Sequence, residues 1–391
     1  MTVTNDPRAP GAPRAAAPFT PGVAALPATV PFVAPDALER RRGAPLRVRL
    51  GANESAFGVS PDADRAMRAA LERISWYADP ESFELRSALA ALHGVPMPSL
   101  VVGAGIDDLL GLVVRAFVEP GRHVVASHGS YPTFGYHVSG YGGTLHHVPY
   151  RHDGTNDLEG LAALARRVGA TLIYLSNPDN PTGTWYPSPD VSAFVDATPD
   201  GSLVVLDEAY GEFAPEAAQT AMDADDPRVI RMRTFSKLHG LAGARIGYAV
   251  ATKATVDAFE KIRLHFGVNL LAQAGALASL RDKAFQRRVI DEVDAGRRDY
   301  VALARTLGLQ TLPSHANFVA IDLGTAEVAR ATRAALLDRG VFVRMPAVAP
   351  IDRCIRVTVG TPAERGLFAE VFREVLDRLR DSNVAGTSTK R

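Results

Sequence analysis

Cysteine is almost absent from this chain of 391 residues, because Cys354 is the only one. A single thiol excludes an intramolecular disulfide and a zinc site built from several cysteines. Histidine also lacks the H-E-x-x-H spacing or any comparable pattern of metal ligands, so we assign no metal. This usage fits a reducing compartment, and we expect a cytoplasmic protein.

Excess charge and long apolar runs are missing as well. The chain has 43 Lys and Arg against 43 Asp and Glu, so it lacks the broad positive field that favours nucleic acid or an anionic membrane. The best candidate for a membrane span, residues 101–118, is interrupted by Asp107, Asp108 and Arg115. Such a span needs about 20 apolar residues. We therefore expect neither nucleic acid nor membrane as a partner.

Both ends of the chain have a composition that disfavours regular structure. Residues 1–35 hold eight prolines, many alanines and a single acidic residue, Asp6, so a disordered tail is predicted there. A signal peptide is the alternative, but prolines at 18, 21, 27 and 31 interrupt any apolar helix. Residues 381–391 are predicted to be a frayed tail.

Short apolar runs alternate with longer amphipathic stretches between these tails. Strands are predicted at 123–127, 171–176, 202–207 and 246–251, and helices at 106–118, 157–168 and 189–196. This alternation predicts the α/β class, with a mostly parallel central sheet and helices on both faces. The C-terminal part begins with a helical stretch at 253–307, continues as shorter strands and helices, and predicts a smaller α+β domain.

The predicted boundaries divide the folded part into three segments. Residues 36–70 form an N-terminal segment that joins the small domain, 71–275 form a large domain, and 276–380 form the small C-terminal domain. A chain of this length exceeds the roughly 250–300 residues that one core usually spans.

Polar clusters follow three of the predicted strands. They are N-P-D-N-P-T-G at 177–183, D-E-A-Y at 207–210, and the pair Ser236-Lys237. In a parallel sheet the carboxyl ends of the strands share one edge, so the clusters are expected to converge on one crevice. Taken singly, the first is also explained as a proline-fixed turn, and Asp207 as a helix cap.

Lys237 has no carboxylate neighbour between Arg231 and Arg245, which is unusual for an exposed lysine. A lysine that forms a Schiff base needs a lowered pKa, which burial and a nearby cation such as Arg245 can provide. Asp207 could pair with a pyridinium nitrogen, a contact worth about 4 kcal/mol at 4 Å and an effective dielectric constant of 20. Asn180 and Tyr210 could donate hydrogen bonds to a ring oxygen.

The stretch V-V-G-A-G-I-D-D-L-L supplies donors for a phosphate. Gly103 and Gly105 permit a close turn, and the helix that follows offers free N–H groups. Thr234, Ser236 and Arg245 would complete the phosphate site. A dinucleotide loop of the type G-x-G-x-x-G is the alternative, but Asp108 stands where its third glycine would be.

Taken together, these segments resemble the fold type I pyridoxal-phosphate aminotransferases (class I/II), and within them the histidinol-phosphate aminotransferase group. The resemblance covers residues 30–380. It rests on L-G-A-N-E-S-A-F-G, G-A-G-I-D-D-L-L, S-Y-P-T-F-G-Y-H, N-P-D-N-P-T-G, L-D-E-A-Y, R-T-F-S-K-L-H-G-L-A-G-A-R-I-G-Y, A-N-F-V and I-R-V-T-V-G-T. It implies pyridoxal 5'-phosphate as the cofactor, bound in the large domain.

The resemblance also implies a role for each matching residue. Lys237 would be the Schiff-base lysine and proton shuttle. Asp207 would pair with the pyridine nitrogen, and Phe134 would stack on the ring. The remaining cofactor contacts would come from Asn180 and Tyr210 at the ring oxygen, and from Gly105, Ile106, Thr234, Ser236 and Arg245 at the phosphate. Asn53, Arg344 and Arg356 fall on the substrate side, with Arg356 gripping a carboxylate.

Tyr77, in W-Y-A-D-P-E-S, matches a segment whose tyrosine in this family reaches the neighbouring subunit's site. The resemblance therefore implies a homodimer. The alternative is that Tyr77 has only a packing role, since Trp76 and Ala78 depart from the family's pattern. His239, two residues after Lys237, is a further catalytic candidate.

The resemblance leaves the substrate open. Histidinol phosphate is the predicted amino donor and 2-oxoglutarate the predicted acceptor, in two half-reactions. Phenylalanine or tyrosine stays open as the donor, because Phe134 and Phe32 replace hydroxyl-bearing residues and make the pocket more apolar. A decarboxylase or lyase on the same fold, and a non-catalytic regulator, are further alternatives.

Overall fold

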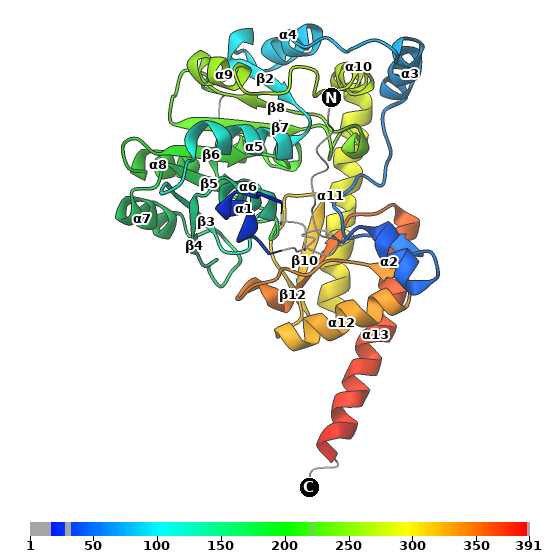
Figure 1. The fold of residues 1–391 in the computed structure, drawn as a ribbon. Helices are drawn as coiled ribbons and strands as arrows, with labels where there is room; N and C mark the ends of the chain where they lie inside the picture. The colour runs from blue at the N-terminus through cyan, green and yellow to red at the C-terminus, as the bar shows by residue number, and fades with distance from the viewer. Residues whose placement is uncertain (1–16, 28–32, 220–221, 389–391) are drawn as a thin grey trace, which may run out of the picture.

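The protein is described from a computed structural model, which covers residues 17–27, 33–219 and 222–388. Its largest sheet has seven strands in the order β2-β8-β7-β6-β5-β3-β4 among these residues (Figure 1). The strands are β2 (Leu100–Gly103), β3 (His123–Ser127), β4 (Thr144–Val148), β5 (Leu172–Ser176), β6 (Leu203–Asp207), β7 (Val229–Thr234) and β8 (Gly247–Val250). Only β8 runs antiparallel to its neighbours, so the sheet is mostly parallel, as predicted.

Helices cover both faces of this sheet, which explains why its central strands are apolar throughout. Alternate side chains of β5 and β6 enter opposite cores: Leu172 and Val205 pack with one, Ile173 and Val204 with the other. The first core includes α5 (Ile106–Phe117), α6 (Pro132–Gly140) and α9 (Lys253–Glu260), and the second includes α7 (Leu158–Val168) and α8 (Ser188–Ala197). Burial on both faces is what a parallel sheet between two helical layers requires.

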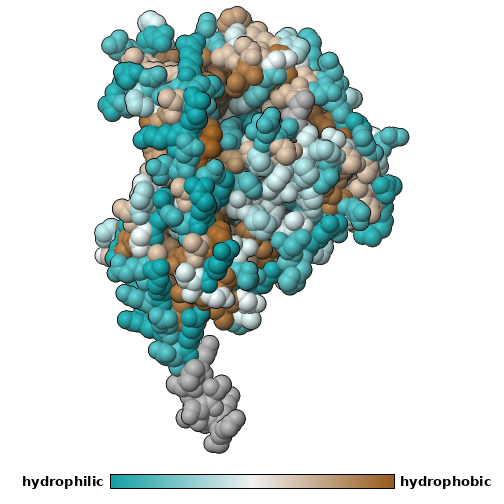
Figure 2. Space-filling model, turned by 180° about the vertical axis from the view of Figure 1, so that it is seen from behind, coloured by the Kyte–Doolittle hydropathy of each residue, from teal (hydrophilic) through white to brown (hydrophobic). Residues whose placement is uncertain are grey.

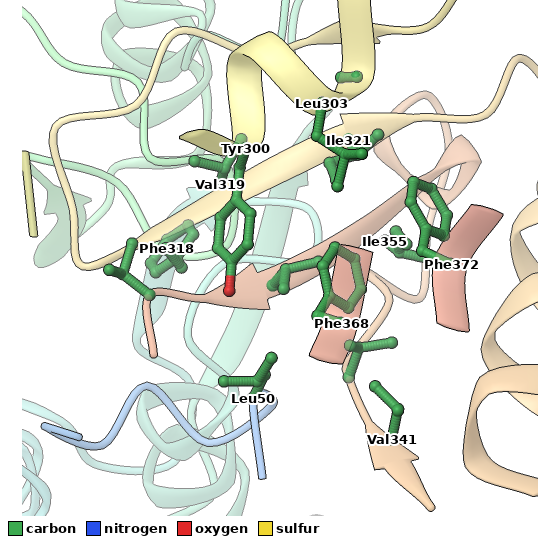
Figure 3. Close-up of a cluster of buried hydrophobic side chains, with 14 of the residues drawn as sticks. Leu50, Tyr300, Leu303, Phe318, Val319, Ile321, Val341, Ile355, Phe368 and Phe372 are labelled. Atoms are coloured by element: carbon green, nitrogen blue, oxygen red, sulfur yellow. The ribbon is translucent and has the colours of Figure 1, made fainter. Parts of the chain in front are cut away.

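Two smaller sheets lie in the other part of the molecule. One has the antiparallel order β12-β10-β9, and the other pairs β1 with β11 in parallel. The strands are β1 (Val48–Arg49), β9 (Gln310–Thr311), β10 (Phe318–Asp322), β11 (Val341–Phe342) and β12 (Cys354–Thr358). The helices beside them are α11 (Lys283–Thr306), α12 (Ala326–Asp338) and α13 (Pro362–Ser388). Leu50, Phe318 and Phe368 belong to their shared core (Figure 3).

The pairing of β1 with β11 attaches the N-terminal segment to the C-terminal part of the chain. The seven-stranded sheet lies within residues 100–250, and the three-stranded sheet within 310–358. The domain boundaries at residues 70 and 275 stay a prediction, and the sheets fall on either side of them. The remaining helices are α1 (Pro21–Ala24), α2 (Pro35–Arg42), α3 (Pro61–Ala70), α4 (Phe83–His93) and α10 (Leu270–Arg281).

The helices differ from the sequence prediction in three regions of the chain. Residues 1–16 and 28–32 of the predicted tail lie outside the described residues, but residues 21–24 form the single turn α1, whose N-cap Thr20 accepts a hydrogen bond from Val23 N. The stretch 253–307 is three helices, because side-chain caps at Asn269 and Asp282 begin new ones. Helix α13 continues past residue 380 to Ser388.

Short 3-10 helices occur at Leu71–Arg73, Met97–Ser99, Gly211–Phe213, Glu216–Ala218, Ala242–Ala244 and Ile351–Arg353. No helix in the described part of the chain combines the length and the apolar character needed to cross a membrane.

Candidate active site

The carboxyl ends of three neighbouring strands meet at one cavity. Ser176 ends β5, Asp207 ends β6 and Thr234 ends β7, and register pairs place Ser176 beside Asp207 and Asp207 beside Met232. The cavity has a volume of about 230 Å³. Its lining includes the sequence-predicted residues Ile106, Asn180, Asp207, Tyr210, Thr234, Ser236, Lys237 and Arg245. The three clusters thus converge, as parallel strands require.

A larger cavity of about 570 Å³ adjoins the first and shares Lys237, Asn180 and Arg245 with it. It adds Asn53, Arg344 and Arg356, the residues predicted on the substrate side, together with the loop segment 345–347. The two cavities therefore form one site with Lys237 between its two ends.

Lys237 is half-buried, and its Nζ donates a hydrogen bond to the main-chain oxygen of Asn53 at 3.1 Å. Burial is the main cause that lowers its pKa to about 8, and the nearby positive charge of Arg356 is the next. Arg245, which the sequence suggested as the cation, lowers the pKa of Lys237 less than Arg356 does. A lowered pKa gives the amine a larger neutral fraction, which is the nucleophilic and basic form.

Asp207 is only 4 % exposed and faces the cavity from the end of β6. Its carboxylate accepts hydrogen bonds from Tyr174 Oη at 2.7 Å and from Ala209 N at 3.0 Å. Burial raises its pKa to about 6, because no cation among the described residues pairs with it. A buried carboxylate in this state would be stabilised by a ligand that brings a positive N–H group.

Several donors gather at the opposite end of the smaller cavity, around the start of α5. Ser236 N donates to Thr234 Oγ1 at 3.0 Å, and Thr234 Oγ1 donates to Ser236 Oγ at 2.9 Å. Gly105 has φ of 90°, a backbone conformation that favours glycine, and a Cβ there would lie 2.6 Å from Arg245 Nη2. The free N–H groups of a helix N-terminus next to such donors suit an anion.

Asp107 is a member of this end that the sequence did not single out. Its Oδ2 lies 3.4 Å from Arg245 Nη2, and its Oδ1 accepts from Tyr131 Oη at 2.7 Å. Tyr131 lines both cavities, and burial raises its pKa above the usual range of tyrosine. Only the folded chain reveals these partners, because they come from separate helices and loops.

Asn180 and Tyr210 lie between the two ends of the site. Tyr210 Oη accepts from Asn53 Nδ2 at 2.8 Å, and burial raises the pKa of Tyr210 to about 12. Asn180 Oδ1 accepts from Arg356 Nη1 at 2.6 Å. The polar atoms of both side chains are thus tied to residues predicted on the substrate side.

Arg344 and Arg356 of the larger cavity are joined through their backbones: Arg344 N donates to Arg356 O, and Arg356 N donates to Arg344 O. Arg356 Nη2 donates to Gly51 O at 3.1 Å, and Arg344 Nη2 donates to Val33 O at 3.2 Å. Arg356 Nε is buried and has no hydrogen-bond partner among the described residues. A bound carboxylate would supply the missing acceptor.

Three predicted residues lie away from the cavities. Phe134 is buried at 1 % exposure and stacks on Tyr174 with ring centroids 4.9 Å apart, while Tyr131 and Tyr210 are the aromatic residues that line both cavities. Tyr77 is 83 % exposed and lines neither. His239 is buried, and its Nδ1 lies 2.7 Å from Ser279 Oγ.

The donor set fits an elongated ligand with an anionic group at one end and a protonated ring nitrogen at the other. Helix α5, Thr234 and Ser236 face the first end, and Asp207 the second, with the Lys237 amine in the same cavity. Pyridoxal 5'-phosphate has this distribution of charge. Within the described ranges, no group of three or more His, Cys, Asp or Glu residues could hold a metal ion.

Comparisons with known proteins agree with this geometry. The model of the family "Aminotransferase class I and II" matches residues 47–372. Histidinol-phosphate aminotransferase 1 of Dechloromonas aromatica (strain RCB) is 37% identical over 347 residues, which are 87% of this chain and 93% of that protein.

Among solved structures, histidinol-phosphate aminotransferase from Sinorhizobium meliloti in complex with pyridoxal-5'-phosphate aligns with a TM-score of 0.90 and 47% identity, covering 94% of this chain and 99% of that one. Aspartate aminotransferase from Thermus thermophilus with maleate aligns with a TM-score of 0.75 at 23% identity, over 92% of this chain and 98% of that one, and shows a shared fold. With the family model spanning most of the sequence, the chain belongs to the class I and II aminotransferases.

Proposed function

We propose that this protein is a pyridoxal-phosphate-dependent aminotransferase that takes histidinol phosphate as amino donor and 2-oxoglutarate as acceptor in a ping-pong reaction. Family membership supports amino transfer, and the relatives named histidinol-phosphate aminotransferase support the donor. The observation that carries the proposal is a lysine with a lowered pKa that lines both a cavity with Asp207 and a cavity with Arg344 and Arg356.

Pyridoxal phosphate supplies, when bound, an aldehyde that reacts with amines and a ring that withdraws electrons. The chain provides the remaining functions. Lys237 Nζ accepts a proton from the substrate carbon and returns it, and its lowered pKa suits both directions. Asp207 keeps the ring nitrogen protonated, and Asn180 and Tyr210 orient the ring oxygen. Gly105, Ile106, Thr234, Ser236 and Arg245 hold the phosphate.

Arg344 and Arg356 bind different substrates in this proposal. Arg356 pairs with the carboxylate of 2-oxoglutarate, because its Nε is buried without an acceptor and its guanidinium group lines the larger cavity. Arg344, in the wall of the same cavity, pairs with the phosphate of histidinol phosphate. Asn53 forms part of the same wall. An aromatic donor would leave the charge of Arg344 without this partner, at a cost in kcat/KM.

We also propose a homodimer in which Tyr77 enters the site of the partner. Trp76 and Tyr77 are 68 % and 83 % exposed, and Leu264 and Phe266 are 73 % and 54 % exposed. The rings of Tyr77 and Phe266 lie 4.7 Å apart, so two of these four exposed side chains form a joint apolar surface. Apolar patches also interrupt the hydrophilic surface of the face drawn in Figure 2. Apolar groups of this size favour burial against a second chain. The cytoplasmic location remains our prediction.

A substrate panel tests the proposed function. Purified protein is expected to show the visible absorption of bound pyridoxal phosphate. Histidinol phosphate should be preferred over phenylalanine, tyrosine and leucine by more than about tenfold in kcat/KM, with 2-oxoglutarate as acceptor. Equal or greater rates with phenylalanine would favour the aromatic alternative, and release of carbon dioxide would favour a decarboxylase.

The Lys237→Ala variant completes this test. It should lose transamination by at least about a thousandfold, because both the covalent attachment and the proton shuttle are removed. Lys253→Ala is the matched control: Lys253 is exposed on α9 and pairs with Asp257, so the rate should stay at the wild-type level. Retention of transamination by Lys237→Ala would overturn the assignment.

A further inference from the structure

Asn53 is a buried residue with an unusual backbone. It is 2 % exposed and has φ of 55°, in the left-handed region that residues other than glycine rarely adopt. Asparagine tolerates this region better than most residues, but the conformation persists only where neighbouring groups hold it. The groups that hold Asn53 are therefore of interest, since its main-chain oxygen contacts Lys237.

Thr358 is the residue that holds Asn53 most directly. Its Oγ1 accepts a hydrogen bond from Asn53 N at 3.0 Å and donates one to Asn53 Oδ1 at 3.1 Å. One hydroxyl thus fixes both the backbone and the side chain of Asn53. Thr358 is 2 % exposed and is absent from the lining of both cavities, so it can act on the site only through other residues.

Thr358 is itself firmly placed at the end of β12. Its N donates to Leu50 O at 2.8 Å, and its O accepts from Tyr300 Oη at 3.0 Å. Tyr300 stands in the apolar core shown in Figure 3, with its hydroxyl directed away from the helix that carries it. The hydroxyl of Thr358 therefore joins a rigid core to the end of the Lys237 side chain through one residue, Asn53.

The main-chain oxygen of Asn53 receives two donors. Lys237 Nζ donates at 3.1 Å, and Asn317 Nδ2 donates at 3.1 Å as well. Asn53 Nδ2 in turn donates to Tyr210 Oη at 2.8 Å. The hydrogen bond to this oxygen orients the Lys237 amine. The other hydrogens of the amine remain available to groups in the cavity.

We propose that Thr358 is a positioning residue of the transamination site, which holds Asn53 in its left-handed conformation so that the Asn53 carbonyl orients the Lys237 amine. The proposal rests on the proposed function for the use of that amine. It assigns to Thr358 no contact with substrate or cofactor.

Its measurable consequence is a change in how Lys237 titrates. The charged groups that act on Nζ are Arg356 on β12, Glu54 before α3, Asp107 on α5 and Arg245 after the 3-10 turn 242–244. A neutral substitution at Thr358 removes none of these charges. A carbonyl acceptor stabilises the ammonium form, so loss of its contact lowers the lysine pKa.

The experiment uses cofactor-free full-length protein. Lys237 is labelled with acetic anhydride over a pH series, and mass spectrometry gives the midpoint of its reactivity. Thr358→Val keeps the shape but removes the hydroxyl, and the midpoint should fall by about half a pH unit or more. Thr358→Ser should restore it. Thr332→Val is the matched control, because the buried Thr332 hydroxyl has no hydrogen-bond partner among the described residues, and its midpoint should equal that of the wild type.

A second pair of variants covers the case in which Thr358→Val does not fold. Asn53→Gly adopts a positive φ without strain and keeps the carbonyl in place, so its midpoint should stay close to wild type. Asn53→Ala loses the same side-chain contacts as Asn53→Gly but is disfavoured at φ of 55°, so its midpoint should fall. Equal midpoints for Asn53→Ala and wild type would overturn the proposal.

Kinetics of the cofactor-loaded enzyme give an independent measure. Thr358→Val should lower kcat by about tenfold and leave KM within about twofold, since Thr358 lines neither cavity. A folded Thr358→Val enzyme with wild-type kcat and midpoint contradicts the positioning role. If the wild-type protein neither binds pyridoxal phosphate nor transfers an amine, the proposed function fails, while the labelling result still decides whether Thr358 orients Lys237.

Discussion

The two ends of the site are built in different ways. At the cofactor end, Ser176, Asp207 and Thr234 end adjacent strands of one sheet, so hydrogen-bonded register fixes their spacing. At the substrate end, Arg344 and Arg356 belong to short strands or loops of the smaller part, and the main-chain oxygens of Val33 and Gly51, far earlier in the sequence, accept hydrogen bonds from their guanidinium groups.

Because of this difference, we expect the cofactor end to determine the rate of the reaction and the substrate end to determine which substrates bind. A site built on neighbouring strand ends keeps its geometry as long as the sheet is intact, which suits groups that act on the reacting atoms. A site assembled from distant segments can change its contacts without disturbing that sheet, which suits recognition of different substrates. Substitutions at the cofactor end should therefore affect kcat, and those at the substrate end should affect KM.

Among variants that keep Lys237, the largest effect is expected from Asp207→Asn at the cofactor end. The amide keeps the shape but removes the charge that would stabilise a protonated ring nitrogen. A contact of about 4 kcal/mol corresponds to about a thousandfold in kcat. Steady-state kinetics measure this, and Asp257→Asn, at an exposed carboxylate on α9, serves as control. If Asp207→Asn kept a tenth or more of the wild-type kcat, its charge would not support the reaction.

The cofactor end was also the more predictable part of the molecule. β5 and β6 are continuous apolar runs that end in polar residues, and such runs identify buried strands without knowledge of the fold. β7 has no continuous apolar run, because Arg231 and Arg233 interrupt it. Both arginines are buried and bond Glu208, at 3.0 and 3.1 Å, so charges that looked solvated are paired inside the protein.

The missing parts of the prediction share one cause. Thr358 and Asn53 are 305 residues apart along the chain, and Arg245 meets Asp107 across 138 residues. No local pattern encodes such contacts, because each segment alone is satisfied by water. Arg356 outweighs Arg245 as a neighbour of Lys237 for the same reason: proximity in the fold, rather than in sequence, decides which charge acts.

The second prediction compares the two arginines at the substrate end. For the acceptor 2-oxoglutarate, Arg356→Lys should weaken apparent binding by about 10- to 100-fold, seen as a higher KM, because an ammonium group cannot replace a planar fork that binds a carboxylate through two N–H groups. Arg344→Lys should raise KM mainly for histidinol phosphate. Both variants should keep the visible absorption of the cofactor. Equal effects of the two variants on both substrates would show that the arginines act as one charged surface.

The smallest predicted effect concerns Asp179, which supports the loop where the two ends meet. Asn180, the next residue, lines both cavities and accepts from Arg356. The Asp179 carboxylate is 1 % exposed and accepts from Thr182 N, Thr182 Oγ1, Tyr150 Oη and Asn156 Nδ2. Asp179→Asn keeps the shape of this support but replaces one acceptor oxygen with an NH2 donor, so it removes the titration of the carboxylate together with two of its hydrogen bonds.

Burial raises the pKa of Asp179 to about 6, so the folded protein binds this proton more tightly than the unfolded chain does. The stability from this group is complete below about pH 4 and is lost as pH rises through about 6. Thermal melts of cofactor-free protein between those pH values should therefore show a smaller decrease in Tm for Asp179→Asn than for the wild type.

Asp207 makes Tm decrease with rising pH in the same way, since burial also raises its pKa to about 6. Pyridoxal phosphate should remove only the Asp207 part, because a protonated ring nitrogen would pair with that carboxylate, whereas Asp179 lines neither cavity. If the cofactor abolished the pH dependence of Tm completely, the titration of Asp179 would be coupled to cofactor binding, and this prediction would be wrong.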